Sequence, residues 1–177
     1  MLPPSGTQRV IDALEYDLIG GRARWVADLN EFFRNYQTRD TTFDLYARGR
    51  TRNKGLLLSK FFAWTALPNY SVSLFCVDES RGGNLTIDKL RRKMEAVFYI
   101  IREEELQWAW LIVLSSKELP PQVVSFVTRY DRRELGLALA STSSGQVVTS
   151  YNQIGRSIGK QLRLGKLLKR LQYGKTN

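Results

Sequence analysis

The stretch that decides the fold spans residues 86–114 and reads TIDKLRRKMEAVFYIIREEELQWAWLIVL. Its first part, 86–104, predicts a helix because apolar residues recur at helical spacing and Asp88 lies in the first turn, where the helix dipole favours a carboxylate. Its last part, 108–114, is an unbroken apolar run, which is typical of a strand covered on both faces. A helix followed by such a strand indicates an α/β fold.

Short apolar runs on either side of this stretch predict further strands of one sheet. They lie at 42–48, 70–78, 135–140 and, as a short edge strand, 147–148. Residues 56–64 form another apolar run, for which a strand is preferred and a helix is the alternative. As a strand, 56–63 would pair antiparallel with 42–48 in a hairpin across residues 50–54.

Helices are predicted wherever apolar residues recur at helical spacing. They cover 8–19, which Gly20 and Gly21 end, 23–36, and a short segment that Pro120 and Pro121 open and that runs through Tyr130. The sequence therefore predicts a central mixed sheet flanked by helices. We expect a single α/β domain over residues 1–177, with its core at 8–150 and a basic C-terminal helix at 151–173.

The C-terminal helix is predicted as one amphipathic element capped by Asn152. Gly155 and Gly159 would weaken it in isolation, and they indicate a close approach to another backbone. Its broad apolar side requires a protein core, a partner or a lipid interface to pack against.

Charge is concentrated in this C-terminal segment. The chain carries a formal net charge of +10; residues 151–177 hold seven basic residues and no acidic one, which leaves +3 for the first 150 residues. Cations facing phosphates together bind a polyanion, so we expect a nucleic acid as partner, DNA more than RNA. The predicted contacts are Arg156, Lys160, Arg163, Lys166, Lys169 and Arg170 and, around the predicted hairpin, Arg48, Arg50, Arg52 and Lys54.

Composition excludes several classes of enzyme. Histidine is absent, which removes the usual general base, zinc ligand and nucleophile activator. Any catalysis would use Asp, Glu, Lys, Tyr or Ser, and carboxylates that hold Mg²⁺ are the most economical choice. Cys76, the only cysteine, sits in an apolar run and is expected in the core. No long apolar run and no signal-peptide pattern occurs, so we expect a cytoplasmic protein without a transmembrane segment.

The order of predicted elements, with early strands grouped before a helix and a buried strand after it, resembles the PD-(D/E)xK, or restriction-endonuclease-like, superfamily. The residues that prompt the comparison are Glu15 in the first helix, Asp44 in FDLYAR and Lys60 in LLLSK. In that family an Asp on one strand and an acid-x-Lys on the next hold a divalent cation, and many resolvase-like members add a Glu from the first helix. The resemblance covers roughly 8–150 and implies these three residues as catalytic, with Mg²⁺ as cofactor in an active nuclease.

The chain departs from this pattern at Leu58, which stands two residues before Lys60 where the family has a carboxylate. Asp78 and Glu79, at the end of the next predicted strand, could supply carboxylates, and Glu79 is a candidate metal ligand. Arg81, however, takes the place of the motif lysine.

These residues also have structural interpretations. Asp44 could pair with Arg48 or Arg50, Lys60 could extend from an edge strand to solvent, and Glu15 could lie on a solvated surface.

The sequence thus favours a nucleic-acid-binding protein of nuclease-like fold that is catalytically inactive and needs no cofactor, as a homodimer or part of a larger assembly. One alternative is an active Mg²⁺-dependent nuclease that acts on DNA. Another is a peripheral membrane or scaffold protein that uses its basic amphipathic helix.

Overall fold

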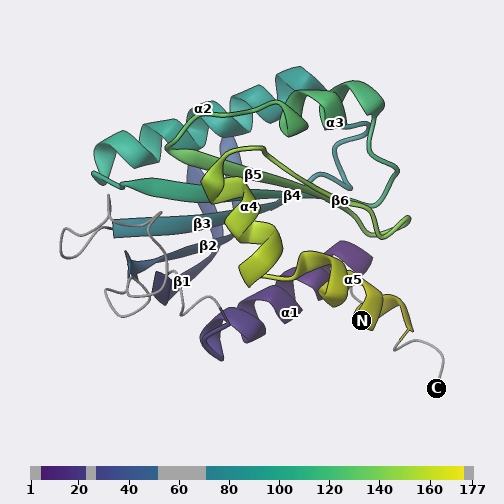
Figure 1. Ribbon diagram of the computed structural model, residues 1–177, viewed down its shortest axis with the longest axis horizontal. Coiled ribbons are helices and arrows are strands. Elements are labelled where there is room, and N and C mark those ends of the chain that lie inside the picture. The colour runs from purple at the N-terminus through teal and green to yellow at the C-terminus, as the bar shows by residue number, and fades with distance from the viewer. Residues whose placement is uncertain (1–4, 23–26, 52–70, 174–177) are drawn as a thin grey trace.

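The computed structural model describes residues 5–22, 27–51 and 71–173, which form a six-stranded mixed sheet with helices on both faces (Figure 1). The strands follow one another across the sheet in chain order. They are β1 (Ala27–Thr38), β2 (Thr41–Thr51), β3 (Ser71–Asp78), β4 (Trp108–Ser115), β5 (Leu135–Ser141) and β6 (Val147–Thr149). β1, β2 and β3 are antiparallel, β3, β4 and β5 are parallel, and β6 is antiparallel to β5. This confirms the predicted α/β class and the mixed sheet flanked by helices.

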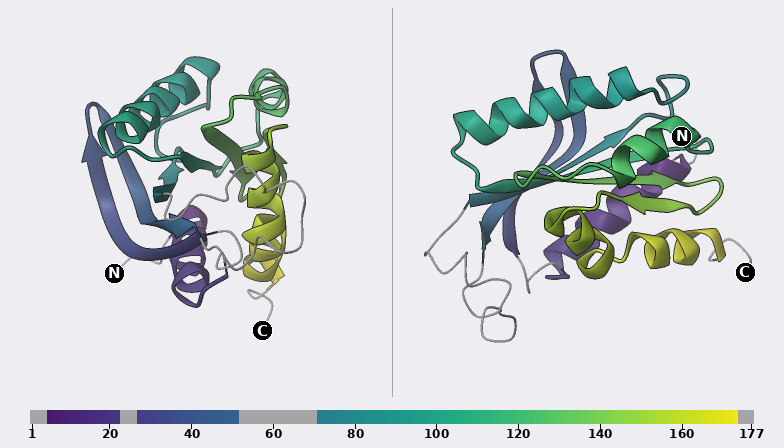
Figure 2. Two further views of the ribbon diagram at one scale, coloured as in Figure 1. Left: turned by 60° about the vertical axis from the view of Figure 1, so that its left-hand side comes forward. Right: turned by 45° about the horizontal axis from the view of Figure 1, so that its top comes forward.

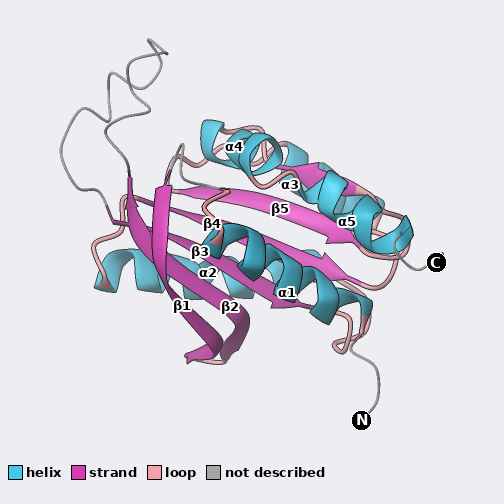
Figure 3. Ribbon diagram, turned by 90° about the horizontal axis from the view of Figure 1, so that it is seen from below, coloured by secondary structure: helices cyan, strands magenta, loops and turns pink. Residues whose placement is uncertain are grey.

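The helices form two layers, one on each face of the sheet (Figures 1 and 2). α2 (Ile87–Glu103) and α3 (Pro121–Thr128) cover one face, because each connects two parallel neighbours and such connections share one hand. α1 (Gly6–Ile19), α4 (Gln153–Gln161) and α5 (Leu164–Tyr173) cover the other face, where Figure 3 shows them lying across the sheet.

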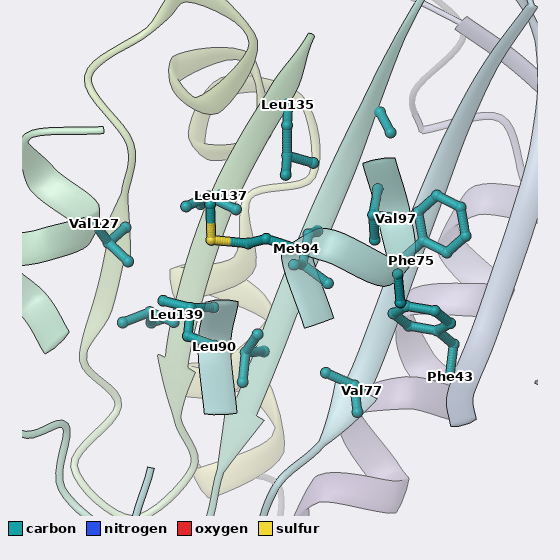
Figure 4. Packing of buried hydrophobic residues seen from close by; sticks show 14 of the residues in the cluster. Phe43, Phe75, Val77, Leu90, Met94, Val97, Val127, Leu135, Leu137 and Leu139 are labelled. Atoms are coloured by element: carbon teal, nitrogen blue, oxygen red, sulfur yellow. The ribbon is translucent and has the colours of Figure 1, made fainter. Parts of the chain in front are cut away.

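The core consists of two apolar layers that share the sheet. β4 is buried on both faces, as its unbroken apolar sequence predicts. Its side chains alternate between the layers: Trp110 and Ile112 pack toward α1 and α4, and Leu111 and Val113 pack toward α2. Figure 4 shows the second layer, in which these labelled side chains meet between α2, α3 and the sheet: Phe43, Phe75, Val77, Leu90, Met94, Val97, Val127, Leu135, Leu137 and Leu139.

Most elements lie where the sequence predicts them. The helices predicted at 8–19, at 86–104 and after Pro120 are α1, α2 and α3, and the strands predicted at 42–48, 70–78, 108–114, 135–140 and 147–148 are β2 to β6. Thr86 caps α2 by accepting a hydrogen bond from the Lys89 N–H. Cys76 is buried in β3, and burial raises its pKa.

The helix predicted at 23–36 is wrong over the part that the structure describes, because residues 27–38 form β1. Phe33 and Tyr36 do share a face, with ring centroids 6.3 Å apart. They share it because Asn35 adopts a φ of +52°, which interrupts the alternation of a regular strand. An irregular strand therefore imitates helical spacing, and its pairing with β2 supplies the hydrogen bonds that decide its structure.

The predicted hairpin between 42–48 and 56–63 is also wrong. Over residues 45–48, β2 pairs with β1 on one edge and with β3 on the other, so no edge remains for a further strand there. Residues 56–63 themselves lie outside the described residues. The hairpin partner of β2 is β1, joined through a turn at Arg39 and Asp40, and this twisted hairpin extends past α2 (Figure 2).

The C-terminal segment is two helices instead of the single one predicted. α4 ends at Gln161, and Arg163 adopts a φ of +50° before α5 begins at Leu164. Asn152 caps α4 as predicted, since its side chain accepts a hydrogen bond from the Gly155 N–H at 2.7 Å. No helix among the described residues is long and apolar enough to cross a membrane.

Candidate functional site

Two carboxylates from neighbouring strands, Asp44 of β2 and Asp78 of β3, meet where those strands diverge. The last backbone pair between the strands on this side is Leu45 with Cys76. Just beyond it, the Asp78 N–H donates to Asp44 Oδ2 at 2.7 Å. We call Asp44 and Asp78 the acid pair.

The Asp78 carboxylate has partners for both of its oxygens. Thr7 Oγ1, in the first turn of α1, donates to Oδ2 at 2.6 Å, and the Ser80 N–H donates to Oδ1 at 2.8 Å. Burial raises the pKa of Asp44 and the Asp78 carboxylate adds to this rise, whereas the hydrogen bond from the Asp78 N–H and the charge of Arg81 act in the opposite direction. The acid pair is therefore a hydrogen-bonded junction between β2, β3 and α1.

Glu15 lies in α1 but is paired with a cation instead of being a freely solvated residue. Arg34 of β1 donates to Glu15 Oε2 through Nε at 3.0 Å and also through Nη2, and it donates to Asp12 at 2.9 Å. These contacts raise the pKa of Arg34, mainly through the hydrogen bond to Glu15. Arg34 thus balances the carboxylate that the nuclease resemblance would assign to a metal.

Glu79 lies on the other side of the sheet from the Asp78 carboxylate. It is buried and forms a salt bridge with Lys93 of α2. Asp78 contacts Thr7 of α1 instead, as expected for successive residues of a strand, which point to opposite faces. The structure therefore brings Asp78, and not the predicted metal ligand Glu79, next to Asp44.

The remaining catalytic candidate, Lys60, lies outside the described residues, as do Leu58, Arg52 and Lys54. In the part of the chain that the structure covers, no group of three or more acidic, cysteine or histidine side chains could hold a metal ion.

The two β2 arginines predicted around the hairpin lie in the second half of that strand. Arg48 bonds Glu31 of β1, with Nε at 3.0 Å, and lies 3.4 Å from Glu104 after α2. Neither Arg48 nor the exposed Arg50 is the partner of Asp44, which bonds the Asp78 N–H.

The C-terminal cations between residues 156 and 170 are exposed. The apolar side of α4 and α5 packs into the core, where Ile158, Leu162 and Leu167 are no more than 3% exposed. We define the C-terminal basic surface as the exposed residues of the opposite side: Arg156, Lys160, Arg163, Lys166, Lys169 and Arg170.

Two members of this surface have partners. Arg170 lies 3.5 Å from Asp17 of α1, and the Arg156 guanidinium stacks over the Tyr151 ring at 4.2 Å. The other four make no ion pair with any carboxylate of the described residues. Their charge is therefore available to a ligand.

The backbone of α4 lies close to the backbone of β5, and this contact fixes which side of α4 faces solvent. A Cβ on Gly155 would lie 2.0 Å from Ser150 Oγ, and one on Gly136 of β5 would lie 2.6 Å from the Gly155 nitrogen. Gly155 is therefore required for α4 to dock on β5, as the sequence predicts, whereas a Cβ on Gly159 would make an ordinary contact. Trp110 Nε1 also donates to Ser157 Oγ of α4 at 3.0 Å.

Sequence reasoning missed three residues of these sites, Thr7, Tyr151 and Arg34. No sequence pattern links Thr7 to Asp78, because the two residues are far apart in the chain. Tyr151 comes just before Asn152, the cap of α4, and belongs to no apolar repeat that would single it out. The partnership of Arg34 with Glu15 has no local signal, because the apolar spacing of residues 23–36 predicts a helix and not β1.

Comparisons with protein-family models, with curated proteins and with solved structures found no match to this chain. Function is therefore inferred from the acid pair and the C-terminal basic surface themselves.

Proposed function

We propose that the protein binds nucleic acid through the C-terminal basic surface, on a restriction-endonuclease-like fold that does not hydrolyse its ligand. The observation that carries this proposal is that Lys160, Lys166 and Lys169 are exposed and have no acidic partner among the described residues. Arg163 is exposed and without an acidic partner there as well. Unpaired cations on one surface bind phosphates and release counterions from the nucleic acid.

The buried leucines of α4 and α5 support a polyanion over a lipid surface. A peripheral membrane helix needs a free apolar face to enter the interface. Here Leu164 and Leu168 are 1% exposed and belong to the core layer beneath α1. A partner that approaches α4 and α5 from solvent therefore contacts their exposed cations and not their leucines.

The order of elements supports the restriction-endonuclease-like part of the proposal. α1 is followed by the antiparallel strands β1, β2 and β3, then by α2 and by the parallel strand β4. This agrees with the grouping of early strands before a helix that prompted the comparison. The acid pair also comes from two neighbouring strands, as the acidic positions of that family do.

The contacts of the carboxylates support the absence of catalysis. Glu15 is engaged by Arg34 and Glu79 by Lys93, and both oxygens of Asp78 accept hydrogen bonds. Mg²⁺ requires near-octahedral oxygen ligands, so these bonds would have to be exchanged for metal contacts. In addition, Ser80 stands two residues after Asp78, where the motif has a lysine.

An active Mg²⁺-dependent nuclease is the second candidate, and one observation favours it. The Asp78 N–H donates to Asp44, so the two acidic residues lie together, and the charge of Arg81 acts on Asp44. Cleavage that requires both carboxylates would support this alternative.

Binding is tested by fluorescence anisotropy with labelled oligodeoxynucleotides, comparing the wild type with a Lys160→Gln, Lys166→Gln, Lys169→Gln triple variant. We expect the triple variant to bind at least about tenfold more weakly at physiological salt. The matched control replaces the exposed Arg91, Arg92 and Arg102 of α2 by Gln, which removes the same charge from the opposite face of the sheet. Equal losses in both variants would mean that net charge, and not the C-terminal basic surface, determines the affinity.

A further inference from the structure

Tyr151 is an exposed aromatic residue held between two buried polar residues at the junction of β6 and α4. Tyr151 is 62% exposed, whereas Ser150 and Asn152 are 1% and 5% exposed. Ser150 Oγ accepts from the Leu137 N–H and donates to Asn152 Oδ1, both at 2.9 Å. The Asn152 amide donates to the Leu135 carbonyl at 2.7 Å. The backbone on both sides of Tyr151 is therefore fixed, and its ring is presented to solvent.

The ring lies against the C-terminal basic surface. The Arg156 guanidinium is 4.2 Å from the centroid of the Tyr151 ring, within the range of a cation–π contact. Arg156 is the first cation of that surface, and Lys160 follows it one helical turn later on α4. An aromatic ring and phosphate-binding cations thus lie next to each other.

We propose that Tyr151 and Arg156 form a stacking platform for an unpaired base, so that the ligand of the C-terminal basic surface is single-stranded nucleic acid. This inference rests on the proposed function. In a duplex the bases stack on one another and offer only their edges in the grooves, whereas an unpaired base offers its face to an aromatic side chain. Exposed rings beside a positively charged groove are how single strands are held without sequence preference.

The other exposed aromatic side chains of the described residues lack this combination. Tyr16 of α1 is 78% exposed but stands between two acidic residues, Glu15 and Asp17. Phe33 of β1 is 40% exposed, and within the β1–β2 hairpin it stacks on Tyr46 and lies tilted against Tyr36. Tyr16 therefore provides a control, a tyrosine that is more exposed than Tyr151 and is not part of the C-terminal basic surface.

The test measures the affinity of Tyr151→Ala and Tyr151→Phe for a labelled oligothymidine and for a labelled DNA duplex. We expect Tyr151→Ala to lose about tenfold in affinity for the single strand and to bind the duplex as the wild type does. Tyr151→Phe keeps the ring and should bind both like the wild type, and so should Tyr16→Ala. Circular dichroism checks that each variant is folded.

Two results would overturn the platform while the proposed function stands: an unchanged affinity of Tyr151→Ala for oligothymidine, or an equal loss on both ligands. A loss in Tyr151→Phe as large as that in Tyr151→Ala would assign the effect to the hydroxyl group and would also contradict stacking. Wild-type protein that binds neither ligand would instead refute the proposed function, and the platform with it.

Discussion

The N–H of Asp78 donates to the carboxylate of Asp44 at 2.7 Å, one step beyond the last backbone pair of β2 and β3 on that side. The side chain of one strand therefore takes over the acceptor role that a backbone carbonyl has within the ladder. A carboxylate that the resemblance to the nuclease superfamily would assign to catalysis thus has a structural role at the point where β2 and β3 part.

Replacing Asp44 tests this structural role. Asp44→Ala leaves the partly buried Asp78 N–H without its acceptor, and we expect a loss of about 1–3 kcal/mol in unfolding free energy. Asp44→Asn keeps an acceptor oxygen at the same place and should lose less. Urea unfolding of both variants measures the difference, and equal losses would show that the hydrogen bond does not matter.

The pH dependence of stability follows from the raised pKa of Asp44. A carboxyl group whose pKa is raised by burial stabilises the fold while it is protonated. This contribution disappears as the pH rises from the ordinary pKa of the group, 3.8, through its raised pKa in the folded protein. Asn does not titrate, so Asp44→Asn should gain stability relative to the wild type over that interval. Urea midpoints of both proteins at a series of pH values give the stability of Asp44→Asn relative to the wild type. A relative stability that falls as the pH rises would contradict a raised pKa of Asp44.

Two glycines of α4 should respond in opposite directions to alanine. Gly155→Ala would place a Cβ 2.0 Å from Ser150 Oγ, so we expect a loss of about 1–3 kcal/mol as α4 shifts away from β5. Gly159→Ala is the control, since its Cβ would be 3.9 Å from Thr149 and alanine should stabilise the helix by about 1 kcal/mol. Thermal unfolding of the wild type and both variants measures these changes. A Gly155→Ala protein as stable as the wild type would refute the close docking of α4 on β5.

Catalysis should be absent. We expect the protein with Mg²⁺ to leave plasmid DNA and labelled oligonucleotides intact, because the Glu15 carboxylate is held by Arg34 and the Asp78 carboxylate by Thr7 and Ser80. The measurement is a cleavage assay that includes Asp44→Ala and Asp78→Ala proteins prepared in the same way. Turnover in the wild type that both variants lose would establish the nuclease alternative.

The elements that sequence analysis predicted are those whose burial is uniform or strictly periodic. β4 is apolar at every position because both of its faces are covered, and α2 repeats its apolar residues along one side. β1 was missed because Asn35 disturbs its alternation, so that Phe33 and Tyr36 lie three residues apart on one face. No local pattern records a pairing with a strand that comes later in the chain.

The candidate site was predictable only in part for a similar reason. The six exposed cations of the C-terminal basic surface follow from charge and spacing alone, although the break between α4 and α5 at Arg163 does not. Asp44 was identified, but its partner depends on where β3 ends relative to β2, which is a matter of register. The salt bridges of Glu15 and Glu79 depend on which helix covers which face, and residue order does not contain that information.

The most direct test of the central claim is the salt dependence of nucleic-acid affinity in the wild type and in the Lys160→Gln, Lys166→Gln, Lys169→Gln variant. If the three lysines neutralise phosphates, the slope of log affinity against log salt should become shallower by about two to three, at roughly 0.7 per contact on a single strand and 0.9 on a duplex. The Arg91→Gln, Arg92→Gln, Arg102→Gln control should keep the wild-type slope. An unchanged slope and affinity in the folded lysine variant would contradict the claim that the C-terminal basic surface binds nucleic acid.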